Sequence, residues 1–205
     1  MRPGTKVLVG TLVAFAAAWL VLVAGSYRQL GRLRAAEPFP GAEPFPRPPT
    51  GLAAIGRQIY LANGCVDCHT QQIRPKRSGS DLAREWGSRR SVPRDYINDQ
   101  PPLLGSHRDG PDLFNIGVRK TDANWHHLHL YQPRATSPGS LMPSFRFLYE
   151  RRKIVGQPTH RAIRFPEGRS PGPGYEVVPT PEATALVAYL LSLDHTVPLR
   201  EAGTP

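Results

Sequence analysis

The stretch Cys65-Val66-Asp67-Cys68-His69 decides how the rest of the chain is interpreted. It holds the only two cysteines of the sequence, with a histidine directly after the second. This order is typical of a c-type haem attachment site, because each thiol can add to a haem vinyl group as a thioether and the next residue can reach the iron. We therefore expect one covalently bound haem c, with His69 as the proximal axial ligand.

Three other interpretations of the motif exist: a disulfide, a redox dithiol and half of a zinc site. A zinc site needs further thiolates or a second pair of ligands at a suitable spacing. The chain has no third cysteine. The sequence therefore favours haem.

Composition and charge limit the class of protein. The 205 residues allow one ordinary domain with extensions, and the 23 prolines and 19 glycines predict long irregular segments. The formal net charge of +10 favours acidic partners, anionic lipid headgroups or nucleic acid. No nucleic-acid recognition module and no catalytic constellation is recognisable, so we expect neither a nucleic-acid partner nor a small-molecule substrate. The charge is interpreted as a docking or membrane-proximal surface.

Residues 7–25 contain no charged side chain. At a rise of about 1.5 Å per residue, this stretch can cross the roughly 30 Å hydrocarbon core of a bilayer. A cleaved signal peptide is the alternative, because Ala24-Gly25-Ser26 supplies small residues, but the run exceeds the usual apolar region of about 7–15 residues. We predict a transmembrane anchor at 7–25 behind a cytoplasmic N-terminus at 1–6, although the flanking charges do not set the orientation.

A proline-rich segment, residues 26–50, follows the predicted anchor. Within it, Ala36-Glu37-Pro38-Phe39-Pro40 recurs as Ala42-Glu43-Pro44-Phe45-Pro46. Because proline fixes φ and has no N–H donor, we expect an extended, semi-rigid spacer that holds the following domain near the membrane. Residues 51–195 are assigned to that domain and residues 196–205 to a C-terminal tail.

Three helices are predicted in the domain. Thr50 can cap a first helix in which Gly56 interrupts the apolar face, and a glycine at that place favours a close helix crossing. Thr180-Pro181-Glu182 is a start signal for a last helix, the expected partner of the glycine face. Residues 122–131 predict a short third helix that stops at Gln132-Pro133.

An electron-transfer haem needs a sixth iron ligand, and a methionine ligand raises the reduction potential. Met142 is the only methionine besides Met1, and it lies in the stiff stretch Pro138-Gly139-Ser140-Leu141-Met142-Pro143. We predict that Met142 is the sixth ligand, while a gap-filling core methionine is the plainer alternative. Six histidines could compete for the position: His107, His126, His127, His129, His160 and His195.

Together these residues resemble a class I cytochrome c. Gly56 and Tyr60 match the family's glycine and aromatic residue where the first helix crosses the last. Gly110-Pro111-Asp112-Leu113 is similar to the loop whose proline carbonyl accepts a hydrogen bond from the proximal histidine, so the resemblance implies that Pro111 orients that ring. The resemblance extends over residues 51–195. It implies an all-α, class I cytochrome c fold with long loop insertions, preceded by one N-terminal transmembrane helix.

Four stretches and the anchor carry a narrower resemblance: Gly64-Cys65-x-x-Cys68-His69-x-Gln71-x-Ile73-Arg74-Pro75, Trp86-Gly87-Ser88, Gly110-Pro111-Asp112-Leu113, and Trp125-His126-x-x-His129-Leu130-Tyr131-x-Pro133-Arg134 up to Met142-Pro143. They resemble the monohaem subunit II of cbb3-type haem-copper oxidases, the FixO/CcoO family. The sequence departs from that family at Gln72, where methionine is usual, in its proline-rich spacer and in a basic insert near the carboxyl end.

This resemblance implies a cytochrome that relays single electrons to the catalytic haem-copper oxidase subunit in aerobic respiration, beside a second cytochrome c subunit. Oxygen would be reduced in another chain, so no catalytic residue is expected here. The resemblance also implies a single-pass protein of the bacterial inner membrane. Its haem domain would lie on the periplasmic side, where c-type haem is attached.

Two long insertions separate the chain from a minimal cytochrome c. They lie between Ile73 and His107 and from Arg146 to Gly174, and both are rich in basic residues. We interpret them as docking surfaces for the catalytic subunit, with a solvated, poorly ordered loop as the alternative for the second. Arg74, just after the haem motif, is predicted to pair with a haem propionate.

Other functions stay open on sequence grounds. The small cytochrome c subunit of a nitric oxide reductase is also anchored and monohaem. A haem-based gas or redox sensor, or a peroxidase, would need an open or labile sixth position. The Ile-Arg-Pro after the haem motif and the residues from Trp125 to Tyr131 favour the oxidase.

Overall fold

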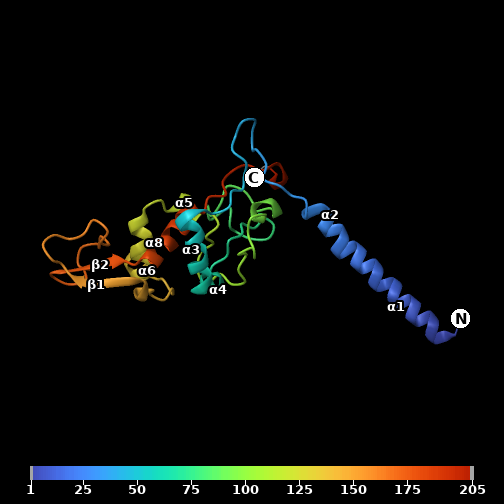
Figure 1. Cartoon of the computed structure of the whole chain (residues 1–205), viewed down its shortest axis with the longest axis horizontal. Helices are drawn as coiled ribbons and strands as arrows, with labels where there is room; N and C mark the ends of the chain where they lie inside the picture. Colours follow the sequence, from blue (N-terminus) through green and yellow to red (C-terminus); the bar gives the residue numbers. More distant parts are fainter. Residues whose placement is uncertain (1, 204–205) are drawn as a thin grey trace.

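The computed structural model describes residues 2–203. Met1, in the predicted N-terminal segment, and residues 204–205, in the predicted tail, lie outside the described residues. A long N-terminal helix projects from a domain built of short helices, loops and one β-hairpin (Figure 1).

The N-terminal helix is longer than the predicted anchor. α1 (Pro3–Trp19) continues through the π-helical segment η1 (Leu20–Gly25) into α2 (Ser26–Leu30). The combined 28-residue helix is long and apolar enough to cross a membrane, and its apolar window is not buried against the domain. It contains the whole of the predicted span, residues 7–25.

The predicted spacer is neither wholly extended nor detached from the domain. Its first residues belong to α2, and Ala36 and Phe45 exchange backbone hydrogen bonds of 2.9 and 3.0 Å, which folds the repeat back on itself. Phe45 packs against a small apolar cluster of Val92, Leu199 and Ala202. Partial burial of this aromatic ring helps to hold the proline-rich segment on the domain.

α3 (Gly51–Ala62) and α8 (Pro181–Ser192) cross at the centre of the domain, as the sequence predicts (Figure 1). A Cβ atom added at Gly56 would lie 1.9 Å from the carbonyl oxygen of Ala185. No larger residue fits without moving the helices apart, so the glycine sets the closeness of this crossing.

Side-chain caps begin two helices at the predicted places. Thr180 accepts a hydrogen bond of 3.3 Å from the N–H of Ala183 at the start of α8. Asp122 caps α6 (Ala123–Tyr131) by accepting a hydrogen bond of 2.9 Å from the helix's second residue. Thr50, by contrast, makes no side-chain hydrogen bond at the start of α3.

The prediction of an all-α fold is wrong. β1 (Tyr149–Lys153) and β2 (Tyr175–Pro179) form a two-stranded antiparallel sheet with Tyr149 opposite Pro179, and only 41% of the chain is helical. Val177 of β2 is fully buried, so the hairpin contributes to the core. The charged residues of β1 are exposed one after another and show no alternation of apolar and polar positions, which is why the sequence pattern did not indicate a strand.

The main apolar core draws residues from α3, α6, α8 and both strands. Its fully buried larger side chains include Tyr60, Val177 and Leu186. The remaining elements are short: α4 (Cys65–Cys68), η2 (Pro93–Tyr96), α5 (Ile116–Arg119), α7 (Pro133–Thr136), η3 (Arg146–Leu148) and η4 (Arg200–Ala202).

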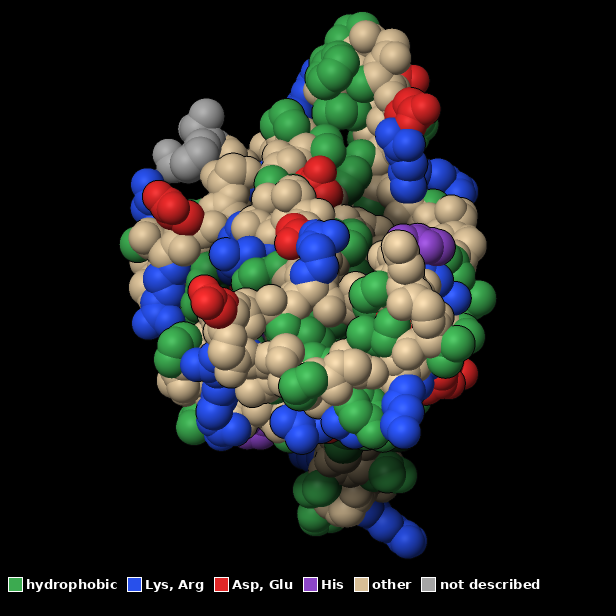
Figure 2. Space-filling view, turned by 90° about the vertical axis from the view of Figure 1, so that its left-hand side faces the viewer, with side chains coloured by type: hydrophobic (Ala, Val, Ile, Leu, Met, Phe, Trp, Pro, Cys, Tyr) green, Lys and Arg blue, Asp and Glu red, His purple; other side chains and the backbone are tan. Residues whose placement is uncertain are grey.

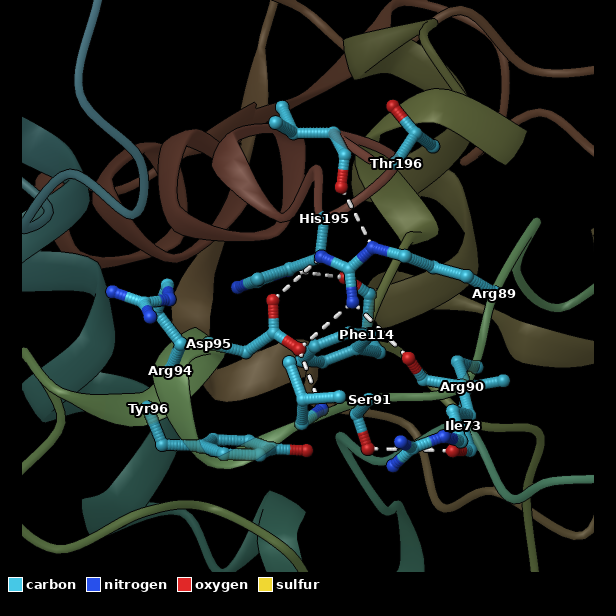
Figure 3. A network of polar contacts seen from close by, with 12 residues as sticks. Ile73, Arg89, Arg90, Ser91, Arg94, Asp95, Tyr96, Phe114, His195 and Thr196 are labelled. Carbon is cyan, nitrogen blue, oxygen red and sulfur yellow. Dashed lines mark hydrogen bonds and ion pairs between the residues drawn. The ribbon is translucent and has the colours of Figure 1, made fainter. Parts of the chain in front are cut away.

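A buried ion pair lies within the first insertion, and its arginine also bonds the chain that follows α8 (Figure 3). The guanidinium of Arg89 donates to both carboxylate oxygens of Asp95, at 2.9 and 2.7 Å, and its Nε donates to the carbonyl oxygen of Val197 at 2.6 Å. Beside this pair, the rings of His195 and Phe114 stack with their centroids 3.9 Å apart. The predicted tail therefore begins as a packed part of the domain, and Arg89 is not free to bind a partner.

Candidate haem-binding site

The haem motif forms the single helical turn α4, close after the end of α3. Gly64 precedes the turn with a φ of +65°, a left-handed conformation that favours glycine. The N–H of His69 donates to the carbonyl oxygen of Cys65, and the N–H of Gly110 donates to that of Cys68, both at 3.0 Å. The turn is thus held from within and from a loop that is distant in sequence.

His69 is oriented by a backbone carbonyl. Its Nδ1 lies 2.7 Å from the carbonyl oxygen of Pro111, the contact that the class I resemblance implied. Because a carbonyl oxygen only accepts, Nδ1 carries the hydrogen and Nε2 keeps its lone pair. A Cβ atom at Gly110 would lie 2.2 Å from the His69 ring, so glycine makes room for the imidazole.

The lowered pKa of His69 indicates that its ring is neutral. Burial lowers this pKa, and the hydrogen bond to Pro111 opposes the effect only in part. The imidazole is therefore neutral at pH 7, which is the form that binds metals. A neutral ring with a fixed Nδ1–H and a free Nε2 is suited to act as an axial ligand.

The two cysteines are free thiols. Burial raises the pKa of Cys65 to about 11, and the pKa of the exposed Cys68 is also raised, by desolvation and then by the charge of Asp109. Both thiols are therefore protonated at neutral pH. Within residues 2–203, no group of three or more His, Cys, Asp or Glu side chains is placed to hold a metal ion, so the zinc alternative lacks further ligands.

Asp112 organises the chain that follows the motif, a role that the sequence analysis missed. Its buried carboxylate accepts hydrogen bonds from the Thr70 hydroxyl at 2.6 Å and from the N–H groups of Gln72 and Phe114, both at 2.8 Å. The loop that carries Pro111 is thereby tied to the residues just after His69. The sequence offered one indication of this role, an acidic residue inside an otherwise apolar loop motif.

Met142 lies partly buried against the same apolar core as Cys65. Its N–H donates to the Ser140 hydroxyl at 3.2 Å. Further along the loop, the N–H of Phe145 donates to the carbonyl oxygen of Leu130 in α6 at 2.8 Å. The loop is therefore anchored to the domain, and ligation of iron by Met142 stays a prediction.

Several of the competing histidines already have partners within the domain: His126 Nε2 lies 2.7 Å from the carbonyl oxygen of Lys120, His127 Nδ1 3.2 Å from the Tyr149 hydroxyl, and His195 Nδ1 2.8 Å from the carbonyl oxygen of Phe114. These contacts fit packing roles. Of the other three, His107 and His160 are exposed at the surface, whereas His129 is partly buried.

His129 lies close to the motif. Burial, and then the charge of His69, lower its pKa to about 4. Its ring stacks on Trp125 with the centroids 4.9 Å apart, and its Nδ1 lies 2.5 Å from the Thr136 hydroxyl. It is therefore the histidine to be compared with Met142 as the possible sixth ligand of the iron.

Two arginines are relevant to the negative charges of a haem. Arg74 donates its backbone N–H to the Asp81 carboxylate at 2.7 Å, and its guanidinium forms no ion pair within residues 2–203, so its predicted contact with a propionate stays a prediction. Arg119 was not identified from the sequence. Its Nη2 donates to the backbone carbonyl of Asp112, while its buried Nε has no hydrogen-bond partner in the described part of the chain.

A cavity of about 790 Å³ opens beside Arg119. Residues of the first insertion, of α5 and of its N-cap line it, among them Leu82, Ala83, Trp86, Asn115 and Val118. None of the predicted haem ligands lines this cavity. A second cavity, of about 370 Å³, lies between the proline-rich segment and α8.

The chain matches the model of the protein family described as "Cytochrome C oxidase, mono-heme subunit/FixO" over residues 9–163. The chain belongs to the FixO family. The match begins in the N-terminal helix and includes the haem motif, the Pro111 loop and Met142. It confirms the recognition made from the sequence, and it indicates a monohaem subunit of a cytochrome c oxidase complex. In a comparison with individual curated proteins, none matched the chain.

Proposed function

We propose that this FixO-family chain is a membrane-anchored c-type cytochrome that passes single electrons to the catalytic subunit of a cbb3-type haem-copper terminal oxidase. The contact between His69 and Pro111 carries the proposal: it presents a neutral imidazole, with Nε2 free, directly after two free thiols. This donor set fits a covalent haem c. Cys65 and Cys68 would hold it by thioethers, with His69 as the proximal and Met142 as the sixth ligand.

A haem bound at this site would supply a one-electron redox couple. The protein contributes position and environment. Pro111 fixes the orientation of His69, Asp112 ties the Pro111 loop to the chain after the motif, and the apolar core that Cys65 and Met142 both contact limits access of water. Oxygen reduction is assigned to another subunit.

The N-terminal helix is proposed to anchor the chain in the bacterial inner membrane by a single pass. Its large apolar side chains are exposed along the helix, among them Leu12, Phe15 and Leu22, and a membrane would cover them. We place the haem domain on the periplasmic side, because c-type haem is attached there. Sequencing the N-terminus of the mature protein distinguishes this anchor from a cleaved signal peptide.

The second insertion is proposed to contact another subunit of the oxidase. It forms the hairpin end of the domain, away from α1 (Figure 1), and Lys and Arg side chains are spread around that face (Figure 2). All of its cations are exposed: Arg146, Arg151, Arg152, Lys153, Arg161, Arg164 and Arg169. The distance from α1 favours an extramembrane partner with an acidic surface, such as the second cytochrome c subunit. Limited proteolysis of the insertion should slow in the assembled complex, and equal cleavage in both states would remove this contact.

Purification of the native complex tests the proposed function. We expect a partner that contains copper and haem, and oxidation of the c-type haem when the reduced complex is mixed with oxygen. A partner with non-haem iron in place of copper would favour the nitric oxide reductase alternative. Ready binding of carbon monoxide by the reduced chain at neutral pH would favour a sensor or a peroxidase, because both need an open sixth position.

A further inference from the structure

The proline-rich segment contains two copies of one pentapeptide, and the two copies have different surroundings. In the second copy, residues 42–46, Phe45 packs against the small apolar cluster that contains Val92. In the first copy, residues 36–40, Phe39 is 63% exposed. The first copy therefore presents to solvent the same aromatic side chain that the second copy places on the domain.

The exposed copy belongs to a closed loop. The backbone pair of Ala36 and Phe45 joins the two ends of the loop with hydrogen bonds of 2.9 and 3.0 Å. At the tip, the N–H of Ala42 donates to the carbonyl oxygen of Phe39 at 3.0 Å, across Pro40-Gly41 with a φ of +82° at the glycine. Proline followed by a glycine of positive φ is typical of a type II turn. Because this backbone is already ordered, burial of the Phe39 ring in a partner would cost little conformational entropy.

The loop lies close to the end of the proposed anchor. α2 ends at Leu30, and the loop begins six residues later, at Ala36. Six extended residues span at most about 20 Å. The loop projects from the domain as the light-blue segment near the C-terminus label (Figure 1). A partner that covers Phe39 therefore needs an extramembrane surface close to the membrane, as a membrane-embedded subunit has.

The charges of the loop indicate the chemistry of the covering surface. In the docked copy, Glu43 forms an ion pair with Arg47. Glu37 of the exposed copy accepts a long hydrogen bond of 3.4 Å from the N–H of Gly41 and forms no ion pair within residues 2–203. Anionic lipid headgroups repel such a carboxylate, whereas a basic side chain of a protein attracts it. The loop therefore fits an apolar pocket with a cation at its rim.

We propose that the first copy of the repeat is a docking element, and that Phe39 inserts into an apolar pocket on the extramembrane face of the catalytic oxidase subunit. The inference rests on the proposed function, because that function supplies the membrane-embedded partner beside the anchor. Aromatic side chains are frequent anchors of protein interfaces, because they bury a large apolar area with few rotatable bonds. Glu37 pairs with the cation at the rim of the pocket. The contact is separate from that of the second insertion at the hairpin end of the domain (Figure 1).

The test uses the full-length holoprotein in detergent, both alone and in the purified complex with a tagged catalytic subunit. Phe39→Ala should leave the melting temperature of the chain alone unchanged, and it should speed release of the chain from the complex about tenfold or more. Phe45→Ala should lower the melting temperature, because its ring packs on the domain. Ile55→Ala, at a 55% exposed site of α3, is the matched control and should change neither quantity.

Release of Phe39→Ala at the same rate as Ile55→Ala would overturn the inference. A melting temperature that falls as far in Phe39→Ala as in Phe45→Ala would also overturn it, because Phe39 would then stabilise the chain's own domain.

Benzoylphenylalanine in place of Phe39 identifies the partner by photo-crosslinking in native membranes. An adduct with the catalytic subunit supports the proposal. An adduct with lipid or with another subunit only, or no adduct, contradicts it. A wild-type chain that does not assemble with the catalytic subunit would instead refute the proposed function.

Discussion

A single carbonyl oxygen determines which ring nitrogen of His69 carries the hydrogen. Because the Pro111 carbonyl occupies Nδ1–H, only Nε2 can act as an iron ligand. The class I resemblance implied this contact, but the carboxylate of Asp112 that fixes the loop was not anticipated. A hydrogen-bond network of this kind depends on the folded path of two distant segments, and no spacing in the sequence reports it.

Met142→Ala should open the sixth position of the iron. Alanine cannot ligate, so we expect a lower midpoint potential and binding of carbon monoxide to the reduced protein. Leu141→Ala is the matched control, because Leu141 is the exposed neighbour in the same loop. A wild-type spectrum and midpoint in Met142→Ala, together with a changed spectrum in His129→Ala, would transfer the role to His129.

The partly buried His127 predicts a loss of stability in acid. Burial lowers its pKa to about 4 in the folded protein, whereas an unfolded chain has a histidine pKa of about 6.5. The unfolded state therefore binds more protons between these two values, and the free energy of unfolding falls as the pH falls through that window. Urea unfolding at several pH values should show a flatter slope in His127→Gln. His160→Gln, at an exposed site, should keep the wild-type slope; an equal slope in all three proteins would disprove the assignment.

At the scale of elements, the two helices that close the core were predictable and the hairpin was not. α3 and α8 have start signals, apolar faces at helical spacing and a glycine at the crossing. β1 is a run of charged residues, and it becomes a strand because β2 pairs with it and buries Val177. The pairing of two segments separated by a long loop is a tertiary effect. For the same reason the docking of Phe45 onto the domain could not be read from the proline-rich repeat.

Gly56→Ala should destabilise the domain. The added Cβ would lie 1.9 Å from a backbone oxygen of α8, so the helices must separate. Overpacking of this kind costs about 1–3 kcal/mol, and the better helix propensity of alanine offsets about 1 kcal/mol of it. Thermal unfolding of the holoprotein measures the effect. Gln58→Ala, on the exposed side of α3, is the control; equal melting temperatures for the two variants would argue against a tight crossing.

The Arg89–Asp95 pair is expected to stabilise the first insertion and to position Arg89, whose Nε donates to Val197 in the C-terminal segment. Removal of one member leaves a buried charge without its partner, so Asp95→Ala should cost about 3–5 kcal/mol of unfolding free energy. The matched control is Glu43→Ala, which removes one member of the exposed pair with Arg47 and should change stability by less than about 1 kcal/mol. Chemical denaturation measures both variants. Equal losses of unfolding free energy in Asp95→Ala and Glu43→Ala would show that the buried pair contributes no more than the exposed one.

At the scale of the whole molecule, the N-terminal helix and the basic hairpin lie at opposite ends (Figure 1). A long apolar helix was predictable from the uncharged run, and the family was recognisable from short motifs around the candidate haem site. The folded conformation of the two insertions was not predictable. In the first, Arg89 turns inward to a buried ion pair, and the second forms a hairpin. The cavity beside Arg119 likewise depends on how the first insertion packs on α5.

Covalent haem attachment is tested most directly by a haem-stained denaturing gel of the full-length chain beside Cys65→Ser and Cys68→Ser, with the haem quantified per chain. We predict a stained wild-type band with one haem per chain, and weak or absent staining in both variants, because each serine removes one thioether. An unstained wild-type band, or staining that is unchanged when either cysteine is replaced, would contradict covalent attachment at this motif.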